Sequence, residues 1–83
     1  MRLLYFAWVR ERIGTSEETV EPPAAVRTVA DLAEWLKARS TGHAEALADL
    51  TKLRAAVDQR FVQLDSELGE AKEVALFPPV TGG

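Results

Sequence analysis

Apolar residues fall in short runs separated by turn-forming residues, and this pattern predicts a protein built largely of short β-strands. The first run, 3–9, is rich in aromatic and branched side chains and is followed by the turn residues Gly14-Thr15. A second strand over 17–21 would pair with it as a hairpin and stop at Pro22-Pro23, because proline cannot donate a ladder hydrogen bond. Further strands are predicted over 53–58, 61–64 and 73–77, with a tight turn at Gln59-Arg60.

Between the second and third strands the spacing becomes helical. Thr28 is a plausible N-cap, and Asp31 three residues later is close to a capping box. The apolar positions that follow share one helix face: Val29, Leu32, Ala33 and Leu36. Trp35 lies one position before Leu36, which favours half-buried packing. Gly42 is expected to end this helix, and a shorter one is predicted over 43–50.

The resulting order, β-β-α-β-β-β with a helical insert, indicates an α+β protein with a ubiquitin-like β-grasp roll. In this fold a mixed sheet packs one main helix, together with a short second helix, on one of its faces. We expect a β-grasp domain over residues 1–77 and an extended Gly-Gly tail over 78–83.

Alternation along the predicted strands places several aromatic side chains on the face away from the helix. The first strand puts Phe6 and Arg10 there, and the last puts Phe77 there. These strands are neighbours in a β-grasp sheet, so Phe6 and Phe77 should meet at the root of the tail, with Phe61 as a third member. An exposed apolar patch usually marks a binding site, so we predict a partner-binding surface. The alternative, that these rings belong to the core, stays open at this point.

Composition and charge narrow the possible functions. The chain has 83 residues, a formal net charge of −3 and no cysteine. One small domain is expected, without disulfides, a thiolate metal site or a cysteine nucleophile. The acidic balance argues against nucleic-acid binding, which needs a basic patch. No apolar run approaches the ~20 residues of a membrane helix. The start lacks a cleavage site typical of a signal peptide, so we expect a cytoplasmic protein without membrane contact.

The usual combinations of catalytic side chains are missing from the sequence. His43 is the only histidine, so neither a Ser-His-Asp set nor a histidine metal cluster can form within one chain. We expect His43 on the surface and no metal site. Carboxylates are plentiful, but nothing in the sequence pairs them in a pocket, and we expect them to be solvated: Glu17, Glu18, Glu67, Glu70 and Glu73.

The C-terminus is the feature that a purely structural role explains least well. Two prolines after the last strand stiffen the chain, and the end, Gly82-Gly83, carries no side chains. Such a segment could thread a narrow channel and present its terminal carboxylate inside a neighbouring protein. Six residues from Pro78 span at most ~20 Å. The competing interpretation is a frayed end without function.

Three blocks resemble the small, sulfur-carrying subunits of molybdopterin synthases. They are F-A-W-V-R-E at 6–11, L-R-A-A-V-D-Q at 53–59, and the segment 73–83, which contains the family signature F-P-P-V-T-G-G intact. Two departures concern turns or strand ends: Asp58 stands where the family often has asparagine, and 71–73 reads Ala-Lys-Glu where the family often has Gly-Asp-Glu. They leave local turn geometry open.

The resemblance implies a non-catalytic, sulfur-donating subunit of a sulfurtransferase complex. Gly83 would be adenylated by a ubiquitin-activator-like enzyme that consumes ATP, and a persulfide donor would then convert the adenylate to a thiocarboxylate. The large subunit would bind the tail, and the sulfur would pass to a cyclic pyranopterin precursor to form the molybdopterin dithiolene; no cofactor would be bound to the carrier itself. The tail positions implied in that contact are Pro78, Pro79, Val80, Thr81 and Gly82.

Three other functions remain possible on the residues alone. The Gly-Gly terminus fits a ubiquitin-like modifier that ends as an amide on lysine, because the same adenylate serves both fates. It also fits a thiazole sulfur carrier, although the proline-rich block should then be absent. The third possibility is an interaction module whose tail does nothing.

Overall fold

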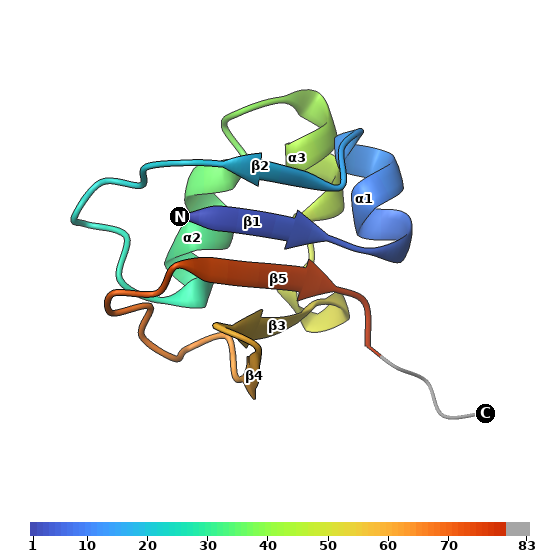
Figure 1. Cartoon of the computed structure of the whole chain (residues 1–83). Helices are drawn as coiled ribbons and strands as arrows, with labels where there is room; N and C mark the ends of the chain where they lie inside the picture. Colours follow the sequence, from blue (N-terminus) through green and yellow to red (C-terminus); the bar gives the residue numbers. More distant parts are fainter. Residues whose placement is uncertain (80–83) are drawn as a thin grey trace.

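The computed structural model describes residues 1–79 and shows one sheet with its helices packed against it (Figure 1). The strand order is β2-β1-β5-β3-β4, with β1 and β5 parallel and the other pairs antiparallel. The elements are β1 (Arg2–Tyr5), α1 (Ala7–Ile13), β2 (Glu17–Thr19), α2 (Val29–Leu36), α3 (Thr41–Ala46), the 3-10 helix η1 (Leu50–Lys52), β3 (Arg54–Val57), β4 (Arg60–Val62) and β5 (Glu73–Phe77). The predicted α+β class and mixed sheet are confirmed.

The first strand is shorter than predicted. β1 ends at Tyr5, Phe6 is the N-cap of α1, and Gly14 closes that helix in a left-handed conformation with φ of 97°. The reason is burial: Val9 is fully buried and Ile13 packs against the core, and these two positions lie one helical turn apart. The prediction that Trp8 and Arg10 continue the strand is therefore wrong.

The main helix begins as the sequence predicted and ends earlier. Asp31 N–H donates to the Thr28 hydroxyl at 3.0 Å, and Thr28 N–H donates to the Asp31 carboxylate at 3.2 Å, which completes the capping box. The predicted apolar face is buried throughout: Val29, Leu32, Ala33 and Leu36. Trp35 is half-buried, as expected.

Gly42 does not end this helix, which stops at Leu36; instead Gly42 lies inside α3. A Cβ built on Gly42 would overlap the backbone carbonyl oxygen of Arg12 in α1. The residue is therefore required by the close approach of α1 and α3, and this approach was not visible in the sequence.

The sheet separates a buried face from a helix-free face. Leu3, Val74 and Leu76 are fully buried under the helices. On the other face, strand register aligns one residue from each strand in a row across the sheet: Glu17, Leu4, Ala75, Ala56 and Phe61. The predicted alternation is thus confirmed within β1 and along β5.

The β3–β4 turn lies at Asp58-Gln59, one residue before the predicted position. Both residues have positive φ, 48° and 70°, as in the tight turns that favour two-residue hairpins. The Asp58 carboxylate accepts hydrogen bonds from the backbone N–H groups of Lys72 and Glu73, each at 3.0 Å. These hydrogen bonds connect the turn to the start of β5. The turn at Asp58, whose geometry the sequence left open, is a regular two-residue hairpin turn.

Candidate functional site

The root of the tail is held by the centre of the sheet. β5 pairs with β1 on one side and β3 on the other, and it ends at Phe77. Pro78 and Pro79 follow and are half-buried. A strand bonded on both sides is a rigid base, so the chain leaves the domain from a fixed point. The remaining predicted site residues lie outside the described part of the chain: Val80, Thr81, Gly82 and Gly83.

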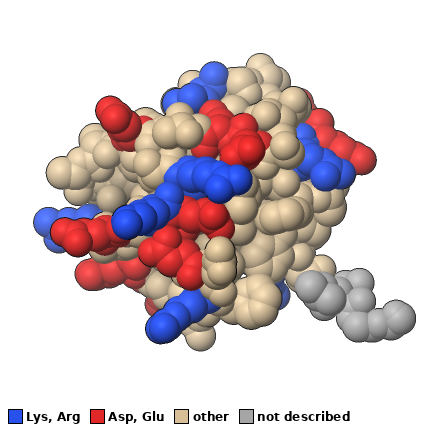
Figure 2. All heavy atoms as spheres, viewed as in Figure 1, with Lys and Arg blue, Asp and Glu red and all other residues tan. Residues whose placement is uncertain are grey.

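Two phenylalanines form an exposed pair beside this root. The rings of Phe61 and Phe77 meet edge to face, with centroids 5.8 Å apart and an interplanar angle of 62°. Phe61 is 86% exposed, which is unusual for so large an apolar side chain. Charged side chains gather over the start of β1 and β5, where Arg2 pairs with Glu17 and Glu73 (Figure 2).

Phe6 and Arg10 reach this region by a different route from the predicted one. Phe6 is 46% exposed and its N–H donates to the Leu76 carbonyl at 3.3 Å, so its backbone lies beside the end of β5. Arg10 follows one turn later on α1 and is exposed. Phe6 therefore adjoins the tail root as a helix cap, while Arg10 does not share the sheet face that was predicted for it.

The comparisons with known proteins cover the entire chain. The ThiS family pattern matches residues 3–83. A molybdopterin synthase sulfur carrier subunit from Escherichia coli (strain K12) is 46% identical over 83 residues, covering 100% of this chain and 99% of the relative. The subunit of the same description from Haemophilus influenzae is 36% identical over 83 residues, with the same coverage. The chain belongs to the ThiS family and, within it, to the molybdopterin synthase sulfur carrier subunits.

Solved structures agree with this assignment to the ThiS family. The Pyrococcus furiosus structure described as molybdopterin converting factor, subunit 1, superposes with a TM-score of 0.74 at 33% identity, covering 95% of each chain. SAMP1 from Haloferax volcanii superposes with a TM-score of 0.70 at 25% identity, covering 100% of this chain and 98% of that one. The resemblance noted in the sequence is confirmed at the level of fold as well.

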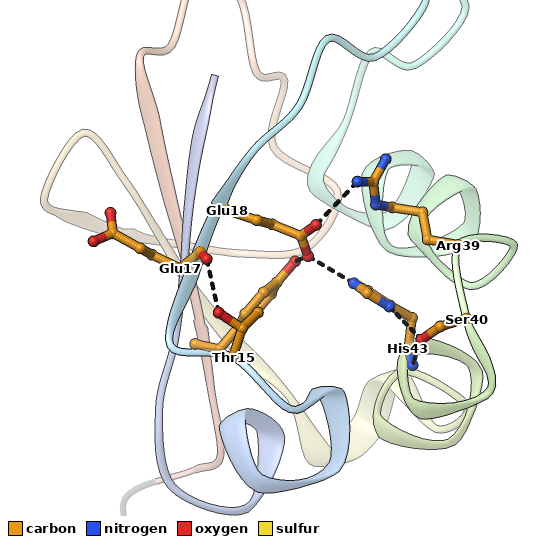
Figure 3. A network of polar contacts seen from close by, with 7 residues as sticks. Thr15, Glu17, Glu18, Arg39, Ser40 and His43 are labelled. Atoms are coloured by element: carbon orange, nitrogen blue, oxygen red, sulfur yellow. Dashed lines mark hydrogen bonds and ion pairs between the residues drawn. The ribbon is translucent and has the colours of Figure 1, made fainter.

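His43 is buried in this ThiS-family chain, contrary to the surface position that we predicted. It is 7% exposed, its Nε2 lies 2.6 Å from a Glu18 carboxylate oxygen, and its Nδ1 lies 2.7 Å from the Ser40 hydroxyl (Figure 3). Arg39 pairs with the other Glu18 oxygen at 3.1 Å, and the Tyr5 hydroxyl donates to Glu18 at 2.7 Å. Glu18 is therefore an anchor between β2, β1 and α3, and the prediction that it is simply solvated is wrong.

This network shifts two ionisations in opposite senses. Burial pushes the pKa of the Glu18 carboxyl upward, but hydrogen bonds from His43 and Tyr5 outweigh it, and the net result is a lowered pKa. Burial, and then the hydrogen bond to Glu18, raises the pKa of the Tyr5 phenol. Among the described residues no buried side-chain nitrogen or oxygen lacks a hydrogen-bond partner. The cluster holds elements together at the β2 edge of the sheet, whereas the tail leaves from its centre.

The two shifts predict a stability profile with losses at both ends of the pH scale. Because the pKa of Glu18 is lowered by folding, its contribution is complete above ordinary carboxyl pKa values and is lost as pH falls below about 4.5. Because the pKa of Tyr5 is raised, its contribution is complete below about pH 10 and is lost as pH rises above that value. We expect Glu18→Gln to cost about 2 kcal/mol of unfolding free energy at pH 7 and to reduce the acid-side slope.

Urea unfolding between pH 3 and pH 11 measures this profile. Tyr5→Phe is the companion variant: it should flatten the alkaline side, and it should reduce the acid-side slope only in part, because the Tyr5 hydroxyl is one of several groups that lower the pKa of Glu18. Asp31 and Asp49 also have lowered pKa values. The main cause is hydrogen bonding, from the backbone N–H groups of Arg27 and Thr28 to Asp31 and from the hydroxyl and N–H of Thr51 to Asp49. Some acid dependence should therefore survive in Glu18→Gln. An identical acid-side slope in Glu18→Gln and wild type would contradict the assignment.

The described residues contain no arrangement suited to bound metal. Within 1–79, no three His, Cys, Asp or Glu side chains come together as metal ligands. No helix in that range is both long enough and apolar enough to cross a membrane. The surface beside the tail root therefore stands out as the candidate functional site of this ThiS-family chain.

Proposed function

We propose that this chain carries sulfur on Gly83 as a thiocarboxylate and delivers it to a cyclic pyranopterin precursor in the large subunit of molybdopterin synthase. The observation that carries the proposal is the intact F-P-P-V-T-G-G ending in a chain matched to its family from residue 3 to residue 83. The relatives described as molybdopterin synthase sulfur carrier subunits, at 46% and 36% identity, support this over a thiazole sulfur carrier.

The chemistry starts from an unreactive group. An ionised C-terminal carboxylate, with a pKa of ~3.5, is a poor electrophile because a nucleophile must approach a negative charge. A ubiquitin-activator-like enzyme would transfer AMP from ATP to Gly83 and release pyrophosphate. The outer sulfur of a persulfide donor then displaces AMP, and a thiol cleaves the resulting disulfide bond, which leaves the thiocarboxylate on Gly83.

The fold supplies position and not acid-base groups. β5 is bonded on both sides, so the tail starts from a fixed point, and Pro78 and Pro79 keep the first part extended. From Pro78 the six residues reach at most ~20 Å, enough to enter a neighbouring active site. The large subunit would provide the pocket, the acid-base residues and the substrate. We propose that these steps take place in the cytoplasm, where ATP is available.

The surface beside the tail root is proposed to bind the large subunit. Phe61 and Phe77 form an exposed ring pair, and the backbone of Phe6 lies beside the end of β5. Arg10, one turn later on α1, is proposed to contact the same partner from the side of the helix. When an exposed aromatic pair is buried in an interface, water is excluded and the pair can supply much of the binding free energy. With the tail inserted, these residues would clamp the domain against the rim of the partner pocket.

Protein isolated from its host, together with the purified large subunit, tests the function. A thiocarboxylate differs from the carboxylate by one oxygen exchanged for sulfur, a gain of about 16 Da that intact-mass spectrometry detects. Added to the large subunit and the pterin precursor, this form should yield the dithiolene product, and the carboxylate form should not. Recovery of Gly83 as an amide on lysine, without sulfur transfer, would favour a protein modifier instead.

Phe77→Ala is expected to weaken binding to the large subunit by about 2 kcal/mol or more. The ring is half-buried, so the isolated domain should lose less than the ~3–5 kcal/mol expected for a core phenylalanine. Phe61→Ala is the cleaner companion variant because its ring is 86% exposed. Calorimetric titration and thermal melts measure both; unchanged affinity with a large loss of stability would assign Phe77 to the core.

A further inference from the structure

A groove opens beside the tail root, and its lining does not include the exposed pair Phe61 and Phe77. It has a volume of ≈680 Å³, and its walls come from α1, η1 and the chain after β5. The lining residues are Trp8, Arg12, Thr51, Lys52, Pro78 and Pro79. Both prolines belong to the predicted tail, so a protein that takes up the tail must pass this groove.

One cation of the groove is held on an aromatic platform. Trp8 and Arg12 lie one turn apart on α1, and the guanidinium carbon of Arg12 is 5.0 Å from the centre of the Trp8 ring. Trp8 is half-buried and packs against the core, which fixes the ring. A guanidinium stacked by its face keeps its N–H edges free, and these edges match the two oxygens of a carboxylate.

The second cation, Lys52, stands at the end of η1. Within residues 1–79 the ion pairs involve other side chains, and neither Arg12 nor Lys52 takes part in one. The acid in the same segment is Asp49, which accepts from the Thr51 N–H at 3.0 Å and from its hydroxyl at 2.6 Å. Its charge also interacts with that of Lys52 and offsets part of the positive charge.

A third cation, Arg54, lies next to η1 without lining the groove. Its guanidinium donates to the Leu53 carbonyl at 2.8 Å and to the Thr51 carbonyl at 3.5 Å. The groove is therefore locally basic on a protein whose formal net charge is −3. Its proline wall has no backbone N–H to offer a partner, so the cations supply its recognition chemistry.

We propose that this groove receives an acidic segment of the large subunit, whose carboxylates pair with Arg12 and Lys52 as the tail is inserted. The proposal rests on the proposed function and names a second contact for the same partner. The apolar contact made by Phe61 and Phe77 would supply affinity. The charged contact made by Arg12 and Lys52 would steer the encounter and fix how far the tail enters. Four residues follow Pro79, and they extend at most ~14 Å, so a shift at the groove moves Gly83 by the same amount.

Calorimetric titration of the large subunit with Arg12→Gln/Lys52→Gln carriers tests the proposal. At about 50 mM salt the double variant should bind about tenfold more weakly than wild type, and its affinity should depend less on added salt. Arg12→Lys/Lys52→Arg, which keeps both charges, should restore most of the affinity. Arg27→Gln/Lys72→Gln is the matched control, because it removes the same charges from exposed sites away from the tail root. All variants should melt within about 2 °C of wild type, since the exchanged side chains are exposed.

Equal affinity and equal salt dependence for the groove variant and wild type would overturn the proposal, as would an equal loss in the control. A groove variant that binds the large subunit normally but is adenylated slowly would also overturn it, and would assign the groove to the activating enzyme. These outcomes are separate from failure of the proposed function, in which the wild-type carrier would itself gain no sulfur or fail to support dithiolene formation.

Discussion

A carrier with a non-removable tag after Gly83 is expected to show no sulfur transfer at all, although its domain folds normally. In the proposed mechanism the reacting atom is the terminal carbonyl carbon, and an added residue turns it into an ordinary peptide amide that cannot be adenylated. Deletion of Gly83 should have the same effect because the reactive carbon then falls ~3.5 Å short of its position. Neither change touches residues 1–79, where the core lies, so melting should be unaffected.

The matched control is the same tag followed by a protease site that restores Gly83 as the last residue on cleavage, which should recover full transfer. Gly82→Val extends the test: a branched side chain restricts φ and would collide with a channel that admits only bare backbone. We expect it to fold and to fail at adenylation or transfer. Full activity of the uncleaved tagged protein would refute the mechanism, and a wild-type rate for Gly82→Val would refute the narrow channel.

Gly42→Ala is expected to destabilise the domain by about 3 kcal/mol, although alanine normally improves a helix by about 1 kcal/mol relative to glycine. The new Cβ would overlap the Arg12 carbonyl oxygen, and a backbone atom cannot rotate away as a side chain can. To make room, α1 and α3 must separate, which opens the core around Val9 and Leu47. The expected fall in melting temperature exceeds about 10 °C.

Gly14→Ala is the control for this effect. Gly14 has φ of 97° and open space around it, so the substitution costs only backbone strain of about 1–2 kcal/mol. The excess cost at Gly42 isolates the helix–helix contact. Because α1 carries Phe6, Trp8 and Arg12, a surviving Gly42→Ala protein should also bind the large subunit more weakly. Increased stability of Gly42→Ala would show that the helices do not approach this closely.

The tail root combines a rigid support with two unlike surfaces. Phe61 and Phe77 offer apolar area on the helix-free face, while Trp8, Arg12 and Lys52 line a basic groove beside the prolines. A partner that contacts both can fix the orientation of the domain as well as its depth. In the proposed mechanism the reacting atom lies at the end of a narrow segment. A small displacement of the tail root relative to the partner would therefore displace the reacting atom as well.

Local signals in the sequence were sufficient for much of the fold. The Thr28–Asp31 capping box and the buried stripe of α2 depend on contacts three or four residues apart, and β5 was bounded correctly at 73–77 by its own composition and the prolines after it. The parity of β1 and β5 placed Phe77 on the outer face, where it meets Phe61. The tail over 78–83 was predicted from composition and motif alone, and its last four residues lie outside the described part of the chain.

Contacts between distant segments decided the rest. The aromatic run 3–9 has strand composition, yet the burial of Val9 against the core turns its second half into α1 and moves Trp8 and Arg10 off the sheet. His43 meets Glu18 from 25 residues away, and Gly42 meets Arg12 from 30 residues away, so neither partner could be read locally. The sequence by itself determined the main helix and the last strand, and it carries the motif on which the proposed role of the terminus rests, because these signals are local. Tertiary packing alone decided where β1 ends, why Gly42 must be glycine and which cations gather at the tail root.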